Sequence, residues 1–233
     1  MTMTRLFLLS ALALVAGCST PPDYYHTLRP AAAAPSGARD AQRVLAIGPV
    51  TVPDSLARDE WVVRTGDTGA MVYDHQLWTQ GLAADVAQSL VDYLNRGTLP
   101  GGLWADAGPT GSGSGADLER PAPLRVRVQV LRLDSSLGPA PADSDQVRWT
   151  IECLPSDAAL GPVEAGRYRT VRTAVRDAAG PAPTAGAGVE SAQQPFDRVA
   201  RAHSDTVRLV AEDVASALRA TAAERAQACI SAR

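Results

Sequence analysis

Apolar and polar residues alternate along three stretches in the second half of the chain. Residues 124–133 place Leu or Val at nearly every second position with Arg or Gln between them, and residues 147–153 and 166–175 repeat the alternation. A period of two is typical of a β-strand with one face in the core and the other in water. We therefore expect three strands here, and antiparallel neighbours joined by short loops are the simplest arrangement.

Shorter runs rich in β-forming residues predict further strands in the first half of the chain, at residues 24–28, 44–52, 61–65, 70–73 and 101–105. The third and fourth runs flank Gly66-Asp-Thr-Gly69, a Gly-containing connection that is typical of a β-hairpin. Gly48-Pro49, inside the second run, marks a bulge or an edge position.

The apolar period changes to that of a helix at two places. Leu82, Val86, Leu90 and Leu94 recur at every fourth position, which forms one apolar stripe on a helix. A longer stripe starts at Phe196 and continues to the end of the last element at spacings of three and four. The order strands, helix, strands, helix predicts an α+β fold: a two-layer α/β sandwich in which two main helices pack on a largely antiparallel sheet.

The N-terminus has the layout of a secretory signal. Arg5 precedes an apolar run, and Ala16-Gly17 places small residues directly before Cys18. A cysteine at this point is typical of bacterial lipoprotein signals, in which the thiol is acylated and the amine freed by cleavage is acylated in turn. We therefore expect lipidation of Cys18, because several acyl chains on one residue anchor a protein stably. The alternative is an ordinary cleaved signal followed by an incidental cysteine.

Cleavage would remove residues 1–17 and leave enough chain for one domain with a sizeable core. We assign residues 18–43 to a lipid-anchored tether that includes the first short strand, and residues 44–233 to a single domain. Gly, Ser, Ala and Pro dominate near residues 108–123 and 180–188, where we expect flexible loops.

The net charge of the chain is −3, and it becomes −4 once Arg5 leaves with the signal. A mildly acidic protein without a basic stripe argues against nucleic-acid binding. No apolar run after the signal approaches the length that crosses a membrane, so the acyl chains are the only membrane anchor that the sequence indicates.

The sequence carries no recognisable catalytic, cofactor or metal motif. Gly111-Ser-Gly-Ser-Gly115 has glycine where a nucleophile elbow places its serine. A phosphate-binding loop needs a lysine, which the chain lacks. The histidines His26, His75 and His203 are scattered without a second ligand one helical turn away, and His203 lies on the apolar stripe of the last helix. We therefore expect a protein without enzymatic activity, metal or cofactor.

Cys153 and Cys229 remain once Cys18 is acylated. Compartments outside the cytoplasm permit disulfides. A bridge between these two cysteines and a pair of free, buried thiols are both consistent with the sequence.

Short motifs in the first half of the chain resemble one known family. They follow the N-terminal cysteine in the order Tyr24-Tyr-x-x-Leu28, Val50-Thr-Val-Pro-Asp-x-Leu56, Val62-Val-Arg64, Tyr73 and Leu77-Trp78. This arrangement resembles the ABC-type transport auxiliary lipoprotein family, which includes paraquat-inducible protein C. The resemblance implies an α/β sandwich without a catalytic role. It also implies service to transport systems built around mammalian-cell-entry (MCE) domain proteins, which move lipids between the two membranes of Gram-negative bacteria.

We therefore expect a lipid-anchored periplasmic accessory component of an MCE-type lipid transport system. The expected partners are an MCE-domain protein, permease components and the membrane, and self-association stays open. Ser19 stands where inner-membrane lipoproteins commonly carry aspartate, which favours the outer membrane with the domain facing the periplasm. The alternative is an envelope-assembly lipoprotein that binds lipid or glycan directly without a transporter; a tethered hydrolase is disfavoured by the missing motifs.

Trp61, Arg64 and Tyr73 are the candidate partner-binding residues. They lie in the predicted hairpin, and Trp and Arg are enriched in binding hot spots. An unpaired hairpin edge can also add to the sheet of another chain. Core packing is the alternative, and it is the interpretation that we favour for Leu77 and Trp78 beside the helix start.

Overall fold

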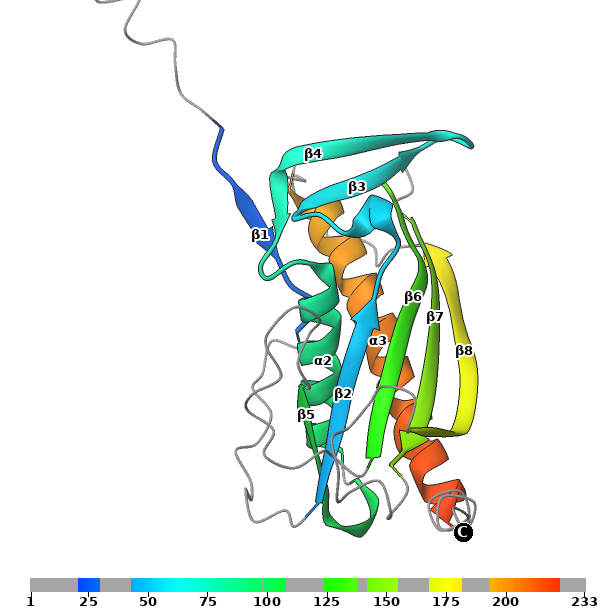
Figure 1. The fold of residues 1–233 in the computed structure, drawn as a ribbon. Coiled ribbons are helices and arrows are strands. Elements are labelled where there is room, and N and C mark those ends of the chain that lie inside the picture. Colours follow the sequence, from blue (N-terminus) through cyan, green and yellow to red (C-terminus); the bar gives the residue numbers. More distant parts are fainter. Residues whose placement is uncertain are drawn as a thin grey trace, which may run out of the picture.

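The computed structural model describes residues 21–29, 43–97, 99–107, 124–137, 142–154, 168–181 and 193–222. Within them, one sheet of three strands, one sheet of five strands and two α-helices form an α+β fold (Figure 1). The fold class predicted from the order of the elements is confirmed. The signal, Cys18, the loop predicted at 108–123 and Cys229 lie outside the described residues.

The larger sheet has the spatial order β5-β2-β6-β7-β8. The bounds are Leu103–Ala107 for β5, Arg43–Thr51 for β2, Leu124–Ser136 for β6, Ala142–Cys153 for β7 and Arg169–Pro181 for β8. β6, β7 and β8 pair antiparallel, the simplest arrangement expected for three neighbouring strands joined by short connections. β2 runs parallel to both of its neighbours, so the sheet is mixed. The ladder between β2 and β6 shifts between Ile47 and Val50, which confirms an irregularity at Gly48-Pro49.

β8 extends beyond its alternating pattern. It ends at Pro181, so Gly180 and Pro181 belong to a strand and not to the loop predicted at 180–188. Pairing with β7 accounts for this, because Gly180 lies opposite Asp143. The rest of that stretch lies outside the described residues.

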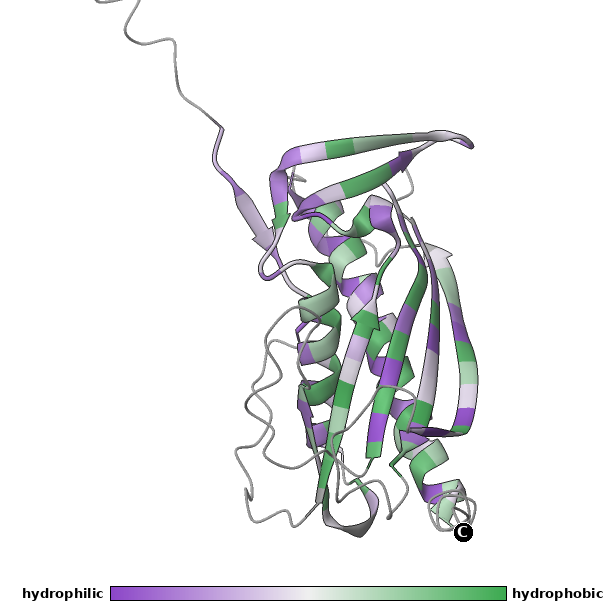
Figure 2. Cartoon of the chain, viewed as in Figure 1, coloured by the Kyte–Doolittle hydropathy of each residue, from purple (hydrophilic) through white to green (hydrophobic). Residues whose placement is uncertain are grey.

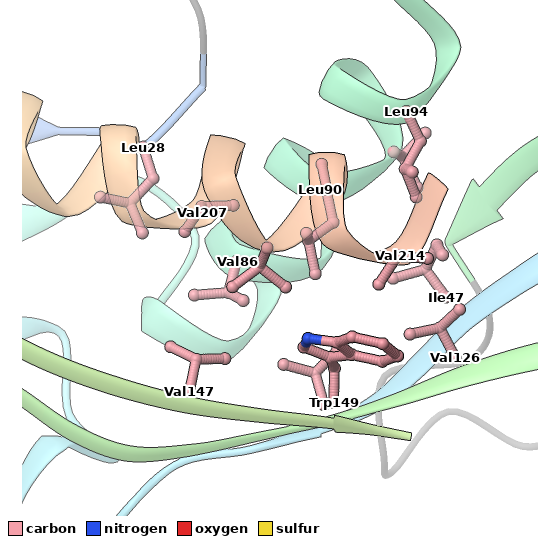
Figure 3. Packing of buried hydrophobic residues seen from close by; sticks show 14 of the residues in the cluster. Leu28, Ile47, Val86, Leu90, Leu94, Val126, Val147, Trp149, Val207 and Val214 are labelled. Carbon is pink, nitrogen blue, oxygen red and sulfur yellow. The ribbon is translucent and has the colours of Figure 1, made fainter. Parts of the chain in front are cut away.

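The helices α2 (Leu82–Arg96) and α3 (Gln194–Ala220) carry the two predicted apolar stripes. Apolar and polar bands alternate along both helices in Figure 2, as expected for helices with one buried face. α2 packs against β2 and β5, and α3 packs against β7. Both helices lie on the same side of the sheet, where Leu90 and Val214 approach Trp149 (Figure 3). Removal of these apolar surfaces from water is the main force that joins the two layers.

The smaller sheet contains β1 (Tyr24–His26), β4 (Gly69–Trp78) and β3 (Glu60–Thr65), with β4 in the middle. β3 and β4 form the predicted hairpin, and β1 lies parallel to the last three residues of β4. In Figure 1 the hairpin spans the top of the molecule, across the start of α3 and the upper end of β6. A short 3-10 helix, η1 (Asp54–Leu56), leads from β2 toward the hairpin.

The chain that enters the domain is fastened along α2. Thr27 Oγ1 donates to Asp85 Oδ1 at 3.1 Å, and Arg29 Nε donates to Asp92 Oδ2 at 2.8 Å. Between them, Leu28 is fully buried in the core. Residues 24–29 therefore pack as part of the folded domain, although they belong to the stretch that the sequence analysis assigns to the tether.

Candidate functional site

A groove opens where the hairpin crosses β6. Its volume is about 430 Å³, and its walls come from η1, β3, the hairpin turn and β6. We call it the hairpin groove, lined principally by Pro53, Leu56, Val62, Arg64, Leu131 and Asp134. Its lining is polar and apolar in similar measure and carries two cations, Arg64 and Arg132, and two anions, Asp67 and Asp134. This combination suits a peptide segment with both apolar and charged side chains.

Arg64 connects the two sides of the hairpin groove. Its guanidinium donates from Nη1 to Asp134 Oδ2 at 3.1 Å and from Nη2 to the backbone oxygen of Asp67 at 2.7 Å. The first contact reaches across to β6, and the second closes the hairpin turn. Because the side chain is half exposed, a partner in the groove can contact it directly, as the sequence analysis expects.

Trp61 does not present a docking surface, and this part of the prediction is wrong for the described structure. The side chain is 1% exposed and stacks on Trp78, with ring centroids 4.5 Å apart. Successive side chains of a strand point to opposite faces. Trp61 and Val63 therefore face the core, whereas Val62 and Arg64 face the hairpin groove.

Tyr73 is intermediate in burial between the exposed Arg64 and the buried Trp61. It is opposite Trp61 in the hairpin ladder, so it shares the inward face of the sheet. Its ring meets Phe196 edge to face with centroids 5.0 Å apart, and the side chain is half buried. Tyr73 supports the hairpin on α3 and does not line the hairpin groove.

A buried chain of hydrogen bonds runs inward from Trp61. Trp61 Nε1 lies 2.9 Å from Ser135 Oγ, which lies 2.8 Å from His203 Nε2, and His203 Nδ1 lies 2.9 Å from Asp145 Oδ2. An indole N–H can only donate and a carboxylate can only accept, so Ser135 accepts a hydrogen bond from Trp61 and His203 donates one to Asp145. With a neutral imidazole, the hydroxyl of Ser135 donates to His203 Nε2. His203 then carries its proton on Nδ1 and donates it to Asp145. This buried chain couples the hairpin to β6, α3 and β7.

The three inner members have the order Ser–His–Asp that serine hydrolases use for nucleophilic catalysis. Here Ser135 is 1% exposed and His203 is fully buried. Neither the hairpin groove nor the second cavity described below is lined by any of the three. In this conformation the serine oxygen has no path to a substrate, so the arrangement acts as a structural polar network. Sequence reasoning missed it because its three members lie on three separate elements, β6, β7 and α3.

A second cavity of about 640 Å³ lies between the entering chain, the end of α2 and the first half of α3. We call it the helix cavity, lined principally by Tyr25, Arg29, Tyr93, Arg96, Arg201 and Asp205. Tyr93 and Ser204 meet across it at 2.8 Å. Its charges are mixed, and its walls are polar and apolar in similar measure.

The family model of the ABC-type transport auxiliary lipoprotein component matches residues 26–215, which is most of the chain. The chain belongs to this family. The match includes both walls of the hairpin groove and the buried hydrogen-bond chain, and it confirms the resemblance found from the sequence motifs. Membership of the ABC-type transport auxiliary lipoproteins makes the protein a transport auxiliary component and a lipoprotein.

Two solved structures show the same fold. Protein XCC0632 from Xanthomonas campestris, of the DUF330 family, is 15% identical with a TM-score of 0.55, and the alignment covers 89% of this chain and 99% of that one. An uncharacterised protein is 16% identical with a TM-score of 0.53, covering 84% and 98% of the two chains. No curated protein matches the chain.

The described part of the chain contains no helix that is long and apolar enough to cross a membrane. The family's description as a lipoprotein instead indicates attachment of this auxiliary component to a membrane of the envelope.

Proposed function

We propose that this auxiliary lipoprotein is the lipid-anchored periplasmic accessory component of an MCE-type lipid transport system, without enzymatic activity of its own. The observation that supports this most is the family match over residues 26–215. In this proposal the domain docks an MCE-domain protein or a permease component, and the acyl chains on Cys18 hold it at the outer membrane. The direct test is affinity purification from detergent-solubilised membranes, in which MCE-domain and permease proteins are expected to co-purify.

The hairpin groove is the proposed docking site. Leu56, Val62 and Leu131 supply apolar lining, while Arg64 and Asp134 supply paired charges at its side. Arginine can hold a partner carboxylate through two parallel hydrogen bonds, and apolar contacts with a charged pair beside them are typical of protein interfaces. The groove also contains residues of two of the family-like motifs, since Pro53 and Leu56 belong to one and Val62 and Arg64 to the other.

Arg64→Ala is expected to weaken binding to the MCE-domain partner by about 1–3 kcal/mol, the range of interface hot spots. The fold should change little, because a half-exposed ion pair contributes about 0–1 kcal/mol to stability. Partner affinity and melting temperature are measured on the same purified variant.

Arg148→Ala is the matched control for Arg64→Ala. Arg148 is also exposed and also contacts a neighbouring side chain, Gln129 at 3.0 Å, but it lies on the outer face of the larger sheet. It should leave the affinity unchanged. A lower melting temperature of Arg64→Ala with unchanged affinity would contradict the docking role and make Arg64 a structural residue.

Cys18→Ser is expected to abolish acylation and release the protein from its lipid anchor, because no other thiol stands at the cleavage point. Intact mass of the purified protein reports the acyl chains, and sucrose-gradient fractionation reports the membrane, with Cys153→Ser as the control that keeps Cys18. If the Cys18→Ser variant were processed as the wild type is and still fractionated with the outer membrane, the role of Cys18 as the anchor would be contradicted. Co-migration of the wild type with inner-membrane markers would contradict only the outer-membrane placement.

Cys153 is fully buried and disulfide-bonded. We propose Cys229 as its partner, because Cys18 is assigned to the anchor and the chain has three cysteines. Peptide mass spectrometry without reduction is expected to find the two peptides cross-linked. An alkylated, unpaired Cys229 in the native protein would contradict this pairing.

The helix cavity favours the alternative function, direct binding of lipid or glycan without a transporter. It is the larger of the two cavities and combines Tyr25 and Tyr93 with Arg29, Arg96 and Arg201, residue types that stack on sugars or hold phosphate. Native mass spectrometry separates the two functions. A retained lipid or glycan without co-purified transporter proteins would favour the alternative.

A further inference from the structure

Two carboxylates and an imidazole meet at the edge of the core, outside the hairpin groove and the helix cavity. Asp143 and Asp145 point inward from β7 and His203 faces them from α3. One ligand atom from each lies within 4.8 Å of the other two. Their exposed fractions are 9%, 2% and 0%. No spacing along the sequence indicates this cluster, because Asp145 and His203 are 58 positions apart.

One buried carboxylate oxygen of this cluster has no hydrogen-bond partner. Asp145 Oδ2 accepts a hydrogen bond from His203 Nδ1. The second carboxylate oxygen, Asp145 Oδ1, is buried and makes no hydrogen bond, although it lies 2.8 Å from the same nitrogen. A buried carboxylate oxygen without a hydrogen bond is costly. A cation among the three side chains would satisfy it.

We propose that Asp143, Asp145 and His203 form a binding site for a divalent transition-metal ion, with Zn²⁺ as the best fit. Zinc accepts imidazole nitrogen and carboxylate oxygen together, whereas Ca²⁺ and Mg²⁺ prefer oxygen alone. Tetrahedral zinc keeps its ligand atoms about 3.3 Å apart, so the three atoms reach this geometry through small side-chain movements. Water from the side of Asp143, the most exposed of the three, completes the coordination.

The buried hydrogen-bond chain then becomes the support of the metal site. A ligating histidine donates its other ring N–H to an oxygen, which fixes the orientation of the ring. Here that oxygen is Ser135 Oγ, 2.8 Å from His203 Nε2. Metal binding through Nδ1 therefore moves the proton of His203 from Nδ1 to Nε2. This exchange of tautomers is a signature that adventitious binding at the surface would not produce.

The test uses the purified full chain, stripped with a chelator and titrated with Zn²⁺, Co²⁺, Ca²⁺ and Mg²⁺ separately. We expect Zn²⁺ and Co²⁺ to bind at about one ion per chain, with the visible spectrum of four-coordinate Co²⁺, and Ca²⁺ and Mg²⁺ to bind far more weakly. Nitrogen chemical shifts of the His203 ring should report the proton on Nε2 in the zinc form and on Nδ1 in the stripped form.

Asp143→Asn is the main variant, since Asp143 lies at the margin of the core and its amide keeps the same shape. We expect this variant to fold normally. Its loss of zinc affinity should exceed about 10–100-fold, the loss that is typical when a residue that hydrogen-bonds to a metal ligand is replaced. Asp177→Asn on β8, whose carboxylate accepts from Gln146 at 2.6 Å, should bind as the wild type does. His75→Ala removes the exposed His75–Asp23 pair, the competing surface site, and should also leave binding intact.

Three results would overturn the proposal. They are wild-type protein that binds no zinc, Asp143→Asn that binds zinc as tightly as the wild type, and loss of binding in His75→Ala. A folded Asp143→Asn variant that loses zinc while Asp177→Asn keeps it would establish the site.

Discussion

Trp61→Ala is expected to lower the free energy of unfolding by about 3–5 kcal/mol, the usual loss when a fully buried aromatic side chain is truncated. The indole fills the space between Trp78, His26 and Phe196. Its removal leaves a cavity where the hairpin rests on α3, and it also removes the donor to Ser135 Oγ. Urea unfolding followed by far-ultraviolet circular dichroism measures the change.

Trp61→Phe separates the two contributions. It retains most of the apolar volume and deletes the N–H, so a loss of about 1–2 kcal/mol is expected from the hydrogen bond. Ser135→Ala removes the other side of the same contact, and a double-mutant cycle with Trp61→Phe should show coupling between the two residues. A Trp61→Ala protein as stable as the wild type, with weaker partner binding, would place this side chain at an interface and contradict its burial.

Asp85→Asn is expected to stabilise the protein at neutral pH, by up to about 3 kcal/mol. Asp85 is fully buried in the first turn of α2, and burial raises its pKa from 3.8 to about 6 despite the hydrogen bond from Thr27. Its Oδ2 has no hydrogen-bond partner. An acidic group near a helix N-terminus is normally favourable, but here desolvation of the charge outweighs that effect.

The effect of Asp85 on stability depends on pH. Because the folded pKa is the higher one, the folded state binds the Asp85 proton more tightly than the unfolded state does. The contribution of the protonated Asp85 carboxyl to the free energy of unfolding is fully present below about pH 4, and it is lost as the pH rises to about 6 and above. Asn imitates the protonated form at every pH.

The stability difference between Asp85→Asn and the wild type should therefore be small at pH 4 and grow up to about pH 7. Urea unfolding of both proteins across this range measures it. Thr27→Val is a second informative variant, because it removes the hydroxyl that donates to Asp85. Loss of this hydrogen bond should raise the pKa of Asp85 further, so the stability of Thr27→Val should depend more strongly on pH than that of the wild type. A variant that is less stable than the wild type at neutral pH would show that the ionised carboxylate stabilises the fold.

Elements with a strong period could be predicted from the sequence, whereas their mutual arrangement could not. The stripe from Leu82 to Leu94 marks α2, and the alternation from Leu124 marks β6, because one buried face imposes its period on the residues. The hydrophobic period carries no information on strand direction. The parallel pairing of β2 with β5 and β6 therefore could not be predicted from it.

The same distinction applies to the candidate site. Residue type selected both Trp61 and Arg64 as docking residues, but the alternation of the strand sends them to opposite faces. Only knowledge of which face of β3 meets α3 could separate them. Ser135 and Asp145 gave no signal in the sequence. His203 lies on the apolar stripe of the last helix, which indicated its burial but not its partners, because only the fold brings the three side chains together.

The parallel pairing of β1 with β4 has a mechanical consequence. In the proposed function the chain reaches β1 from the lipidated Cys18, so relative motion of membrane and domain acts on β1 first. A pull along this strand loads its hydrogen bonds to β4 in shear, where they bear the force together and do not open one after another. Leu28 and the Arg29–Asp92 pair hold the strand from its other end. Tension on the anchor is thereby delivered to β4, the strand that also forms half of the hairpin.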